Sequence, residues 1–412
     1  MKDKEQEKQL SIKQSVTWNT WGNLFYFGVQ WLMTVLVVRL IDYSAAGIYS
    51  LAMSVTNVFA ALSLYGIRNY QISDLNNKYS AGDYAKCRII TELASLVLCT
   101  LFVVANNYSK YTCACIIAYM TFRLSESTFD LFSAIYQRNW RLDKLGISLT
   151  VRSVILFTGF VTAIAITHSI LVAFIVMSVL MHFSIMLYDY KNAEKMETMK
   201  LPGGYSKTKA LLIECAPLAV FAMFSSSIAS IPRYFLDLMA GDEILGIYAS
   251  VAAPTLIIQL VATNVFNPLL SAFSEALLDR KKDVFVNLMK RCIFLVVIIG
   301  IASVIAAKYL GRWGLMLLFG NSIDGYEYLL IPLVLCTIAT AVIWFFSGIL
   351  TVMRSFKHLI IGNALAAVSC ALSSPLMIRL YEAQGATYAL LAGNLLGIAY
   401  LSKSMFYKIK EI

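Results

Sequence analysis

The chain has 412 residues, of which 59% are hydrophobic and 14% are charged, and its formal net charge is +10. Soluble globular proteins are roughly 45–50% apolar and about 25% charged, so this composition excludes an ordinary soluble domain and predicts a polytopic membrane protein. The basic excess does not indicate a nucleic-acid partner, because most Lys and Arg residues lie between apolar runs, where they set membrane topology.

Twelve segments meet or approach the roughly 20 mostly apolar residues that a membrane-spanning helix needs. The N-terminal tail is polar and charged, so we do not expect a cleavable signal peptide before the first segment. The fourth segment is the least apolar. The expected helices cover residues 18–41, 45–67, 88–106, 111–135, 147–167, 169–189, 210–239, 244–270, 292–310, 328–350, 358–379 and 385–405.

Lys and Arg residues are distributed unevenly over the two sides of these helices. If the N-terminus is cytoplasmic, 27 of the 34 lie in inner segments and six in outer loops or outer helix ends, while Arg123 alone falls mid-helix. Cytoplasmic loops carry the excess of basic residues, so both termini are predicted to be cytoplasmic.

A polar segment divides the expected helices into six and six. It covers residues 191–209 and contains Pro202-Gly203-Gly204. We therefore expect an N-terminal six-helix lobe at 1–190, a cytoplasmic linker at 191–209 and a C-terminal six-helix lobe at 210–412. The whole is predicted to be an all-α protein.

Two similar turns support an internal repeat. The stretch Asp42 to Tyr49 follows the first expected helix and ends in Gly47-Ile48-Tyr49, and the stretch Asp242 to Tyr248 follows the seventh and ends in Gly246-Ile247-Tyr248. Aligning them needs a gap of one residue. Their equivalent positions predict two related halves that begin with the same helix-turn-helix.

The fourth expected helix carries three charged residues, which are costly inside a membrane and are therefore candidates for function. Arg123, Glu126 and Asp130 share one helix face with Tyr119. We interpret Arg123 as a cation that binds an anionic head group, and Glu126 and Asp130 as carriers of a coupling proton or cation. The alternative for all three is a structural ion pair that joins neighbouring helices.

Three further arginines are candidates for a substrate cavity. Arg39 and Arg233 lie near the outer ends of the first and seventh helices, where they either line a cavity between lobes or extend to the membrane interface. Arg233 also has a local partner in Asp237, four residues later. Arg152 lies inside the fifth helix, where it either meets a phosphate from the inner leaflet or sets topology.

The sequence gives no signature of an enzyme, metal site or cofactor. The motifs GxxxxGK[ST], HExxH and GxSxG are absent, and the eight cysteines and three histidines lack metal-ligand spacing. A membrane enzyme acting on lipid-linked sugars is the alternative from another class. Such enzymes usually carry a large outer loop, and none is expected here.

Several motifs resemble a known family. They are Arg39-Leu40 followed by Gly47-Ile48-Tyr49, Arg233-Tyr234 followed by Gly246-Ile247-Tyr248, Leu317-Leu318-Phe319-Gly320, and Gly385-Ala386-Thr387-Tyr388-Ala389. With twelve helices in two halves, they resemble the polysaccharide flippases of the multidrug/oligosaccharidyl-lipid/polysaccharide exporter superfamily. The resemblance covers nearly the whole chain.

The resemblance implies two lobes in the bacterial inner membrane. It also implies that the protein carries an oligosaccharide on undecaprenyl pyrophosphate, which is an O-antigen or capsule repeat unit. This cargo would move from the inner to the outer leaflet by alternating access. Membrane lipid, a polysaccharide polymerase and chain-length proteins are the implied partners. A cation-coupled multidrug antiporter of the same superfamily is the alternative, and it is disfavoured because the candidate cavity residues are mainly arginines.

Overall fold

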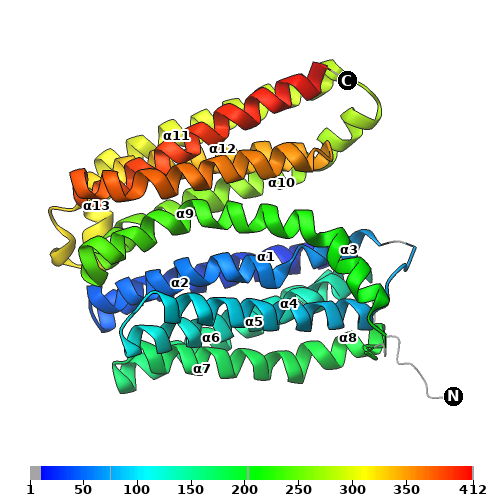
Figure 1. The fold of residues 1–412 in the computed structure, drawn as a ribbon, viewed down its shortest axis with the longest axis horizontal. Helices are drawn as coiled ribbons and strands as arrows, with labels where there is room; N and C mark the ends of the chain where they lie inside the picture. Colours follow the sequence, from blue (N-terminus) through cyan, green and yellow to red (C-terminus); the bar gives the residue numbers. More distant parts are fainter. Residues whose placement is uncertain (1–10, 75, 202–203, 411–412) are drawn as a thin grey trace. The chain divides into compact units, whose positions relative to one another are not determined.

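The computed structural model describes residues 11–74, 76–201 and 204–410, and all regular structure in these ranges is helical (Figure 1). The all-α prediction is confirmed. Pro202 and Gly203 of the predicted linker, and residues 1–10 of the basic N-terminal tail, lie outside the described residues.

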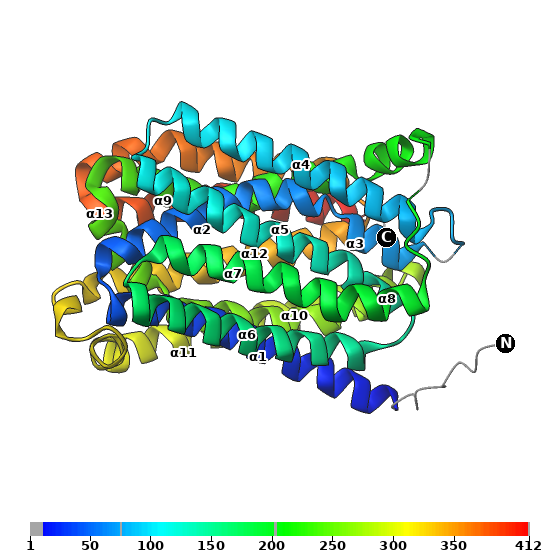
Figure 2. The ribbon, with the colours of Figure 1, turned by 90° about the horizontal axis from the view of Figure 1, so that it is seen from below.

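The chain divides into two compact units, and the first comprises Met1–Leu36 and Phe59–Ala219. Its helices α4, α5, α7 and α6 lie side by side (Figures 1 and 2). The elements of this unit are most of α1 (Ile12–Leu40), the end of α2 (Tyr43–Leu64), α3 (Ile67–Ser73), α4 (Ala81–Ala105), α5 (Lys110–Arg138), α6 (Leu142–Thr167), α7 (Ile170–Ser184), the π-helical turn η1 (Ile185–Tyr190), α8 (Lys191–Met196) and the start of α9 (Ser206–Ala252).

Helix α5 is the central helix of the first unit, because it contacts α3, α4, α6, α7, η1 and α8. Its first turn is capped by the Ser109 hydroxyl, which accepts from the Thr112 backbone N–H. Helices α1 and α6 approach closely at Gly22 and Gly146, where a Cβ on either residue would collide with backbone of the other helix. This approach brings side chains of α1 and α6 together against α5.

The loop between α3 and α4 is held by the Asp74 carboxylate. This group accepts from the backbone N–H groups of Lys78 (2.9 Å) and Tyr79 (3.0 Å) and from the Tyr84 hydroxyl (2.9 Å). Burial alone would raise the pKa of Asp74, but the three donors outweigh it and lower the pKa below its ordinary value. The Lys78 ammonium also pairs with Glu214 at 2.6 Å, which ties the start of α9 to this loop.

The second unit comprises Val37–Val58 and Val220–Ile412. Helix α12 packs against α10, α11 and α13, and the turn that carries η2 and η3 joins α11 to α12 (yellow in Figure 2). Besides parts of α1, α2 and α9, its elements are α10 (Thr255–Leu278), α11 (Lys282–Phe319), the 3-10 turns η2 (Asn321–Ile323) and η3 (Glu327–Leu329), α12 (Leu330–Val352) and α13 (Phe356–Lys410).

Helix α13 holds two expected spans, whereas α9 holds the span 210–239 and only the start of the span 244–270, which continues in α10. Helix α9 is broken at Gly241 (φ 85°) and α13 at Glu382 (φ 50°), so each consists of two helices joined without a loop. Within the described ranges, nine helices are long and apolar enough to cross a membrane, with α9 and α13 counted once each. Helix α5 is not among the nine, which agrees with its low apolar content. Twelve crossings and two six-helix lobes remain predictions.

The two Gly-Ile-Tyr turns lie against each other in the second unit. Gly47 packs on the Asp242 backbone carbonyl and Gly246 on the Tyr43 carbonyl, so a Cβ at either glycine would collide with backbone. The Ser44 hydroxyl donates to Asp242 Oδ2 at 2.8 Å. The two turns therefore contact each other reciprocally, which their similarity in the sequence does not by itself predict.

Candidate functional site

The middle of α5 carries a carboxylate between two cations. Arg123 lies about 20 Å along the helix from Lys110, and its Nη1 donates to Glu126 Oε2 at 3.1 Å. The Tyr26 hydroxyl of α1 donates to Oε1 of the same carboxylate. The side chains of Arg123 and Glu126 are 22% and 20% exposed, so neither is fully buried.

Arg152 of α6 completes this group, and its side chain is only 1% exposed. Its Nη2 lies 3.7 Å from Glu126 Oε1. Its guanidinium carbon lies 3.9 Å from the centre of the Phe129 ring and 5.9 Å from that of Tyr26. We call Tyr26, Arg123, Glu126, Phe129 and Arg152 the central cluster.

The guanidinium of Arg152 lacks hydrogen-bond partners. Within the described part of the chain, none of its three nitrogens has a hydrogen-bonded partner, and Arg123 Nε is also unpaired. A buried N–H without an acceptor costs about 1–3 kcal/mol, more for a charged group. Two arginines with unused donors are suited to bind an anion such as a phosphate.

A second carboxylate also contributes to the charge around Arg152. Asp189 of η1 is fully buried and interacts electrostatically with Arg152. Its Oδ1 accepts from the Ser148 hydroxyl at 2.7 Å and from the Tyr136 hydroxyl at 3.1 Å. These two donors fix Asp189 in place, so it balances the charge of Arg152 without approaching solvent.

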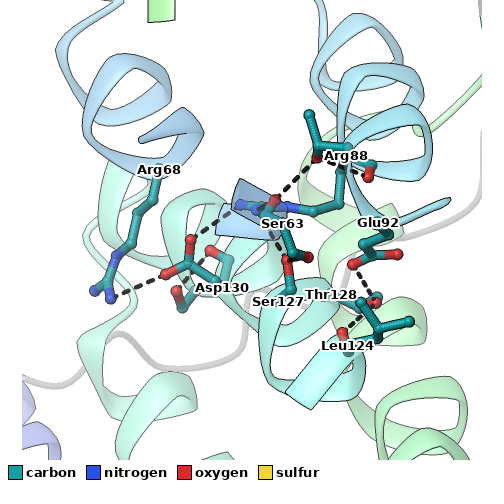
Figure 3. Close-up of polar contacts among 10 residues, drawn as sticks. Ser63, Arg68, Arg88, Glu92, Leu124, Ser127, Thr128 and Asp130 are labelled. Atoms are coloured by element: carbon teal, nitrogen blue, oxygen red, sulfur yellow. Dashed lines mark hydrogen bonds and ion pairs between the residues drawn. The ribbon is translucent and has the colours of Figure 1, made fainter. Parts of the chain in front are cut away.

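Asp130 belongs to a separate cluster, which Figure 3 shows. Its carboxylate pairs with Arg88 of α4 at 3.0 Å and with Arg68 of α3 at 3.4 Å. The buried Arg88 also donates to the Ser63 carbonyl at the end of α2 (2.7 Å) and to the Ser127 hydroxyl (3.0 Å). A cation at a helix C-terminus is stabilising, so this cluster joins α2, α3, α4 and α5.

The structure therefore divides the residues of the predicted stripe. Arg123 and Glu126 meet Arg152, which we had predicted separately, whereas Asp130 meets two other arginines. Tyr119 is buried and packs on Phe174 with ring centres 4.9 Å apart, so it belongs to the aromatic core. Of the six predicted site residues, the structure brings three together, Arg123, Glu126 and Arg152, and these are close enough to contact one ligand.

Arg39 binds the C-terminus of α11. Its Nε donates to the Leu318 carbonyl at 2.8 Å and its Nη2 to the Leu317 carbonyl at 2.6 Å. The last carbonyls of a helix lack intrahelical partners, and a cation there also opposes the negative end of the helix dipole. Arg39 thus has a structural role, and its role in a substrate cavity remains a prediction.

Arg233 of α9 is half-buried. No hydrogen bond or ion pair joins it to any residue the structure describes, so the alternative of a local pair with Asp237 is not formed. It lies within electrostatic range of the Tyr248 hydroxyl in the second unit. Arg233 remains a candidate cation in that unit.

Tyr26, Phe129, Asp189 and Arg88 are among the residues of these clusters that sequence reasoning missed. Tyr26 and Phe129 carry no charge, and Asp189 lies at the end of an expected span. Arg88 is the first residue of an expected span, but α4 begins at Ala81, so Arg88 lies two turns inside the helix. A signal was present in Ser80 and Asp83, which form a capping box and mark the true helix start.

Comparison with known proteins shows the family of this chain. Residues 12–274 match the family described as polysaccharide biosynthesis protein. The chain belongs to this family. The capsular polysaccharide biosynthesis protein CapF of Staphylococcus aureus is 27% identical over 387 residues, which are 92% of this chain and 95% of CapF.

Two solved structures are similar to this chain in fold. A multidrug resistance MATE family transporter of the MOP superfamily, in an inward-facing conformation, matches with a TM-score of 0.72 over 93% of this chain and 95% of its own, at 13% identity. The lipid II flippase MurJ, in an inward closed conformation, matches with a TM-score of 0.71 over 93% and 87%, also at 13% identity. The predicted helical membrane-transporter fold is therefore confirmed.

Proposed function

We propose that the protein is a flippase that moves an oligosaccharide linked to undecaprenyl pyrophosphate from the inner to the outer leaflet of the bacterial cytoplasmic membrane. Its family and its similarity to a capsular polysaccharide biosynthesis protein favour a cargo of this class, such as a capsule or O-antigen repeat unit. The observation that carries the proposal is the pair of arginines with unused donors in the central cluster.

The central cluster has the chemistry that a lipid diphosphate requires. A diphosphate diester carries two negative charges, and the guanidinium groups of Arg123 and Arg152 can each donate to one phosphate. The rings of Tyr26 and Phe129 offer an apolar and aromatic wall beside the head group. In this proposal the lipid tail stays in the bilayer while the head group crosses.

Transport is proposed to proceed by alternating access, without chemistry on the substrate. A multidrug resistance MATE family transporter has a similar fold, so the fold alone does not separate a flippase from a multidrug transporter. The two arginines of the central cluster favour the flippase, because their unused donors suit a phosphate better than a cationic drug. A polysaccharide polymerase and chain-length proteins are proposed to receive the cargo.

Loss of Arg123 tests this function in cells that need the protein for surface polysaccharide. We expect Arg123→Ala to abolish surface polysaccharide, because the exposed half of the anion site is gone. Arg123→Lys should restore part of it, since lysine keeps the charge but cannot donate in a bidentate manner. The measurement is surface polysaccharide by immunoblot, with membrane insertion of each variant followed in parallel.

Lys110→Ala is the matched control, since Lys110 is an exposed cation at the end of the same helix. It should leave surface polysaccharide unchanged. Normal polysaccharide in Arg123→Ala cells would remove Arg123 from the substrate site.

A further inference from the structure

Glu126 occupies the position that an anionic ligand would take. Its two carboxylate oxygens are shared between the cations, with Oε2 facing Arg123 at 3.1 Å and Oε1 facing Arg152 at 3.7 Å. It is partly exposed, whereas Arg152 behind it is buried. A phosphate that approaches Arg152 from the exposed side must therefore displace this carboxylate.

The charges around Glu126 make such a displacement conditional on a proton. The groups that face it are Tyr26 from α1, Arg123 on its own helix and Arg152 from α6, and Asp189 of η1 interacts electrostatically with Arg152. Two cations thus face two carboxylates. A diphosphate diester adds two further negative charges, and like charges in a partly buried site repel strongly.

We propose that Glu126 is a displaceable counter-ion of the substrate site. In the empty protein it neutralises Arg123 and Arg152, and when the diphosphate binds to these arginines it releases them but stays beside the phosphates, where it takes up a proton from solvent. The only covalent change is the new O–H bond on the Glu126 carboxyl. The inference rests on the proposed function, because it assigns the ligand of the same site.

Glu126 is the carboxylate that the diphosphate displaces, and Asp189 stays in place. Asp189 is fully buried and is held by the hydroxyls of Ser148 and Tyr136. Glu126 accepts from one tyrosine hydroxyl, forms ion pairs with the two arginines that the ligand would occupy, and is partly exposed. Removal of its charge should therefore strengthen binding, although it breaks an ion pair.

The test is isothermal titration of the purified full-length protein with N-acetylglucosaminyl farnesyl diphosphate, a diphosphate diester that does not itself titrate near neutral pH. Titrations in two buffers of different ionisation enthalpy give the protons taken up on binding. We expect Glu126→Gln to bind about tenfold more tightly than the unchanged protein at pH 8, a change of about 1.4 kcal/mol. Proton uptake should fall from about one per ligand to near zero.

Glu92→Gln is the matched control, because Glu92 is a half-buried carboxyl in the same unit whose partner is the Thr128 hydroxyl at 2.9 Å. It should keep the affinity and the proton uptake of the unchanged protein. Equal or weaker binding by Glu126→Gln would overturn the proposal and leave Glu126 as a structural ion pair.

Two other results have distinct meanings. If proton uptake persists in Glu126→Gln and disappears in Asp189→Asn, Asp189 is the proton acceptor and the assignment to Glu126 is wrong. If the unchanged protein and every variant fail to bind the diphosphate, the proposed function fails together with this inference. Binding without any proton uptake rejects only the inference.

Discussion

Two carboxylates on α5, four residues apart, have different partners. Glu126 faces Arg123 and Arg152 beside solvent, whereas Asp130 lies between Arg68 and the buried Arg88. Their spacing in the sequence correctly predicts charged residues on a common helix face, but the partners come from α3, α4 and α6. No local pattern encodes which of these helices faces which carboxylate, so sequence reasoning could not separate the two roles.

The structural role of Asp130 predicts a loss of stability. Asp130→Asn leaves the buried Arg88 guanidinium without its counter-charge, and breaking a buried ion pair costs roughly 3–5 kcal/mol. Because the Asp130 side chain is 16% exposed, we expect a cost of about 3 kcal/mol. Thermal unfolding in detergent should show a clear fall in Tm, while affinity for the diphosphate ligand stays the same. A variant with normal Tm and lost affinity would instead place Asp130 in the substrate site.

At the scale of elements, the motifs found in the sequence meet one another in the second unit. The turns at Gly47 and Gly246 pack reciprocally, and Arg39, shortly before the first turn, binds the carbonyls of Leu317 and Leu318. The sequence shows each motif but not the contact, because the residues are far apart along the chain. Glycines such as Gly47 and Gly246 allow two backbones to approach closely, but the sequence does not show which two segments meet.

The close approach at Gly47 can be tested by adding a side chain. Gly47→Leu would place a Cβ against the Asp242 backbone, which cannot yield as a flexible side chain would. Overpacking costs typically 1–3 kcal/mol, and we expect about 3 kcal/mol here. The control is Gly28→Leu, because nothing lies within 4 Å of a Cβ at Gly28. Similar Tm values for both variants would show that the helices separate freely at this turn.

For the whole molecule, composition and hydropathy predict the class of protein and the approximate positions of the helices. In lipid every backbone N–H and C=O group needs a partner within the protein, and a helix supplies these partners within one segment. Helix ends are harder to predict. Helix α9 continues from one expected span into the next through Gly241 alone, and α13 does so at Glu382. The predicted linker at 191–209 ends before the boundary between the compact units, which lies after Ala219 within α9.

The central claim is that this protein moves a lipid-linked sugar by means of the arginines of the central cluster. The most direct measurement uses liposomes that contain the purified protein and a fluorescent N-acetylglucosaminyl polyprenyl diphosphate, with a membrane-impermeant quencher outside. We predict that the unchanged protein transfers label between leaflets faster than protein-free liposomes do, and that Arg123→Ala reduces this rate at least tenfold, to about the protein-free level. Equal rates with and without the protein, or an Arg123→Ala rate equal to that of the unchanged protein, would contradict the claim.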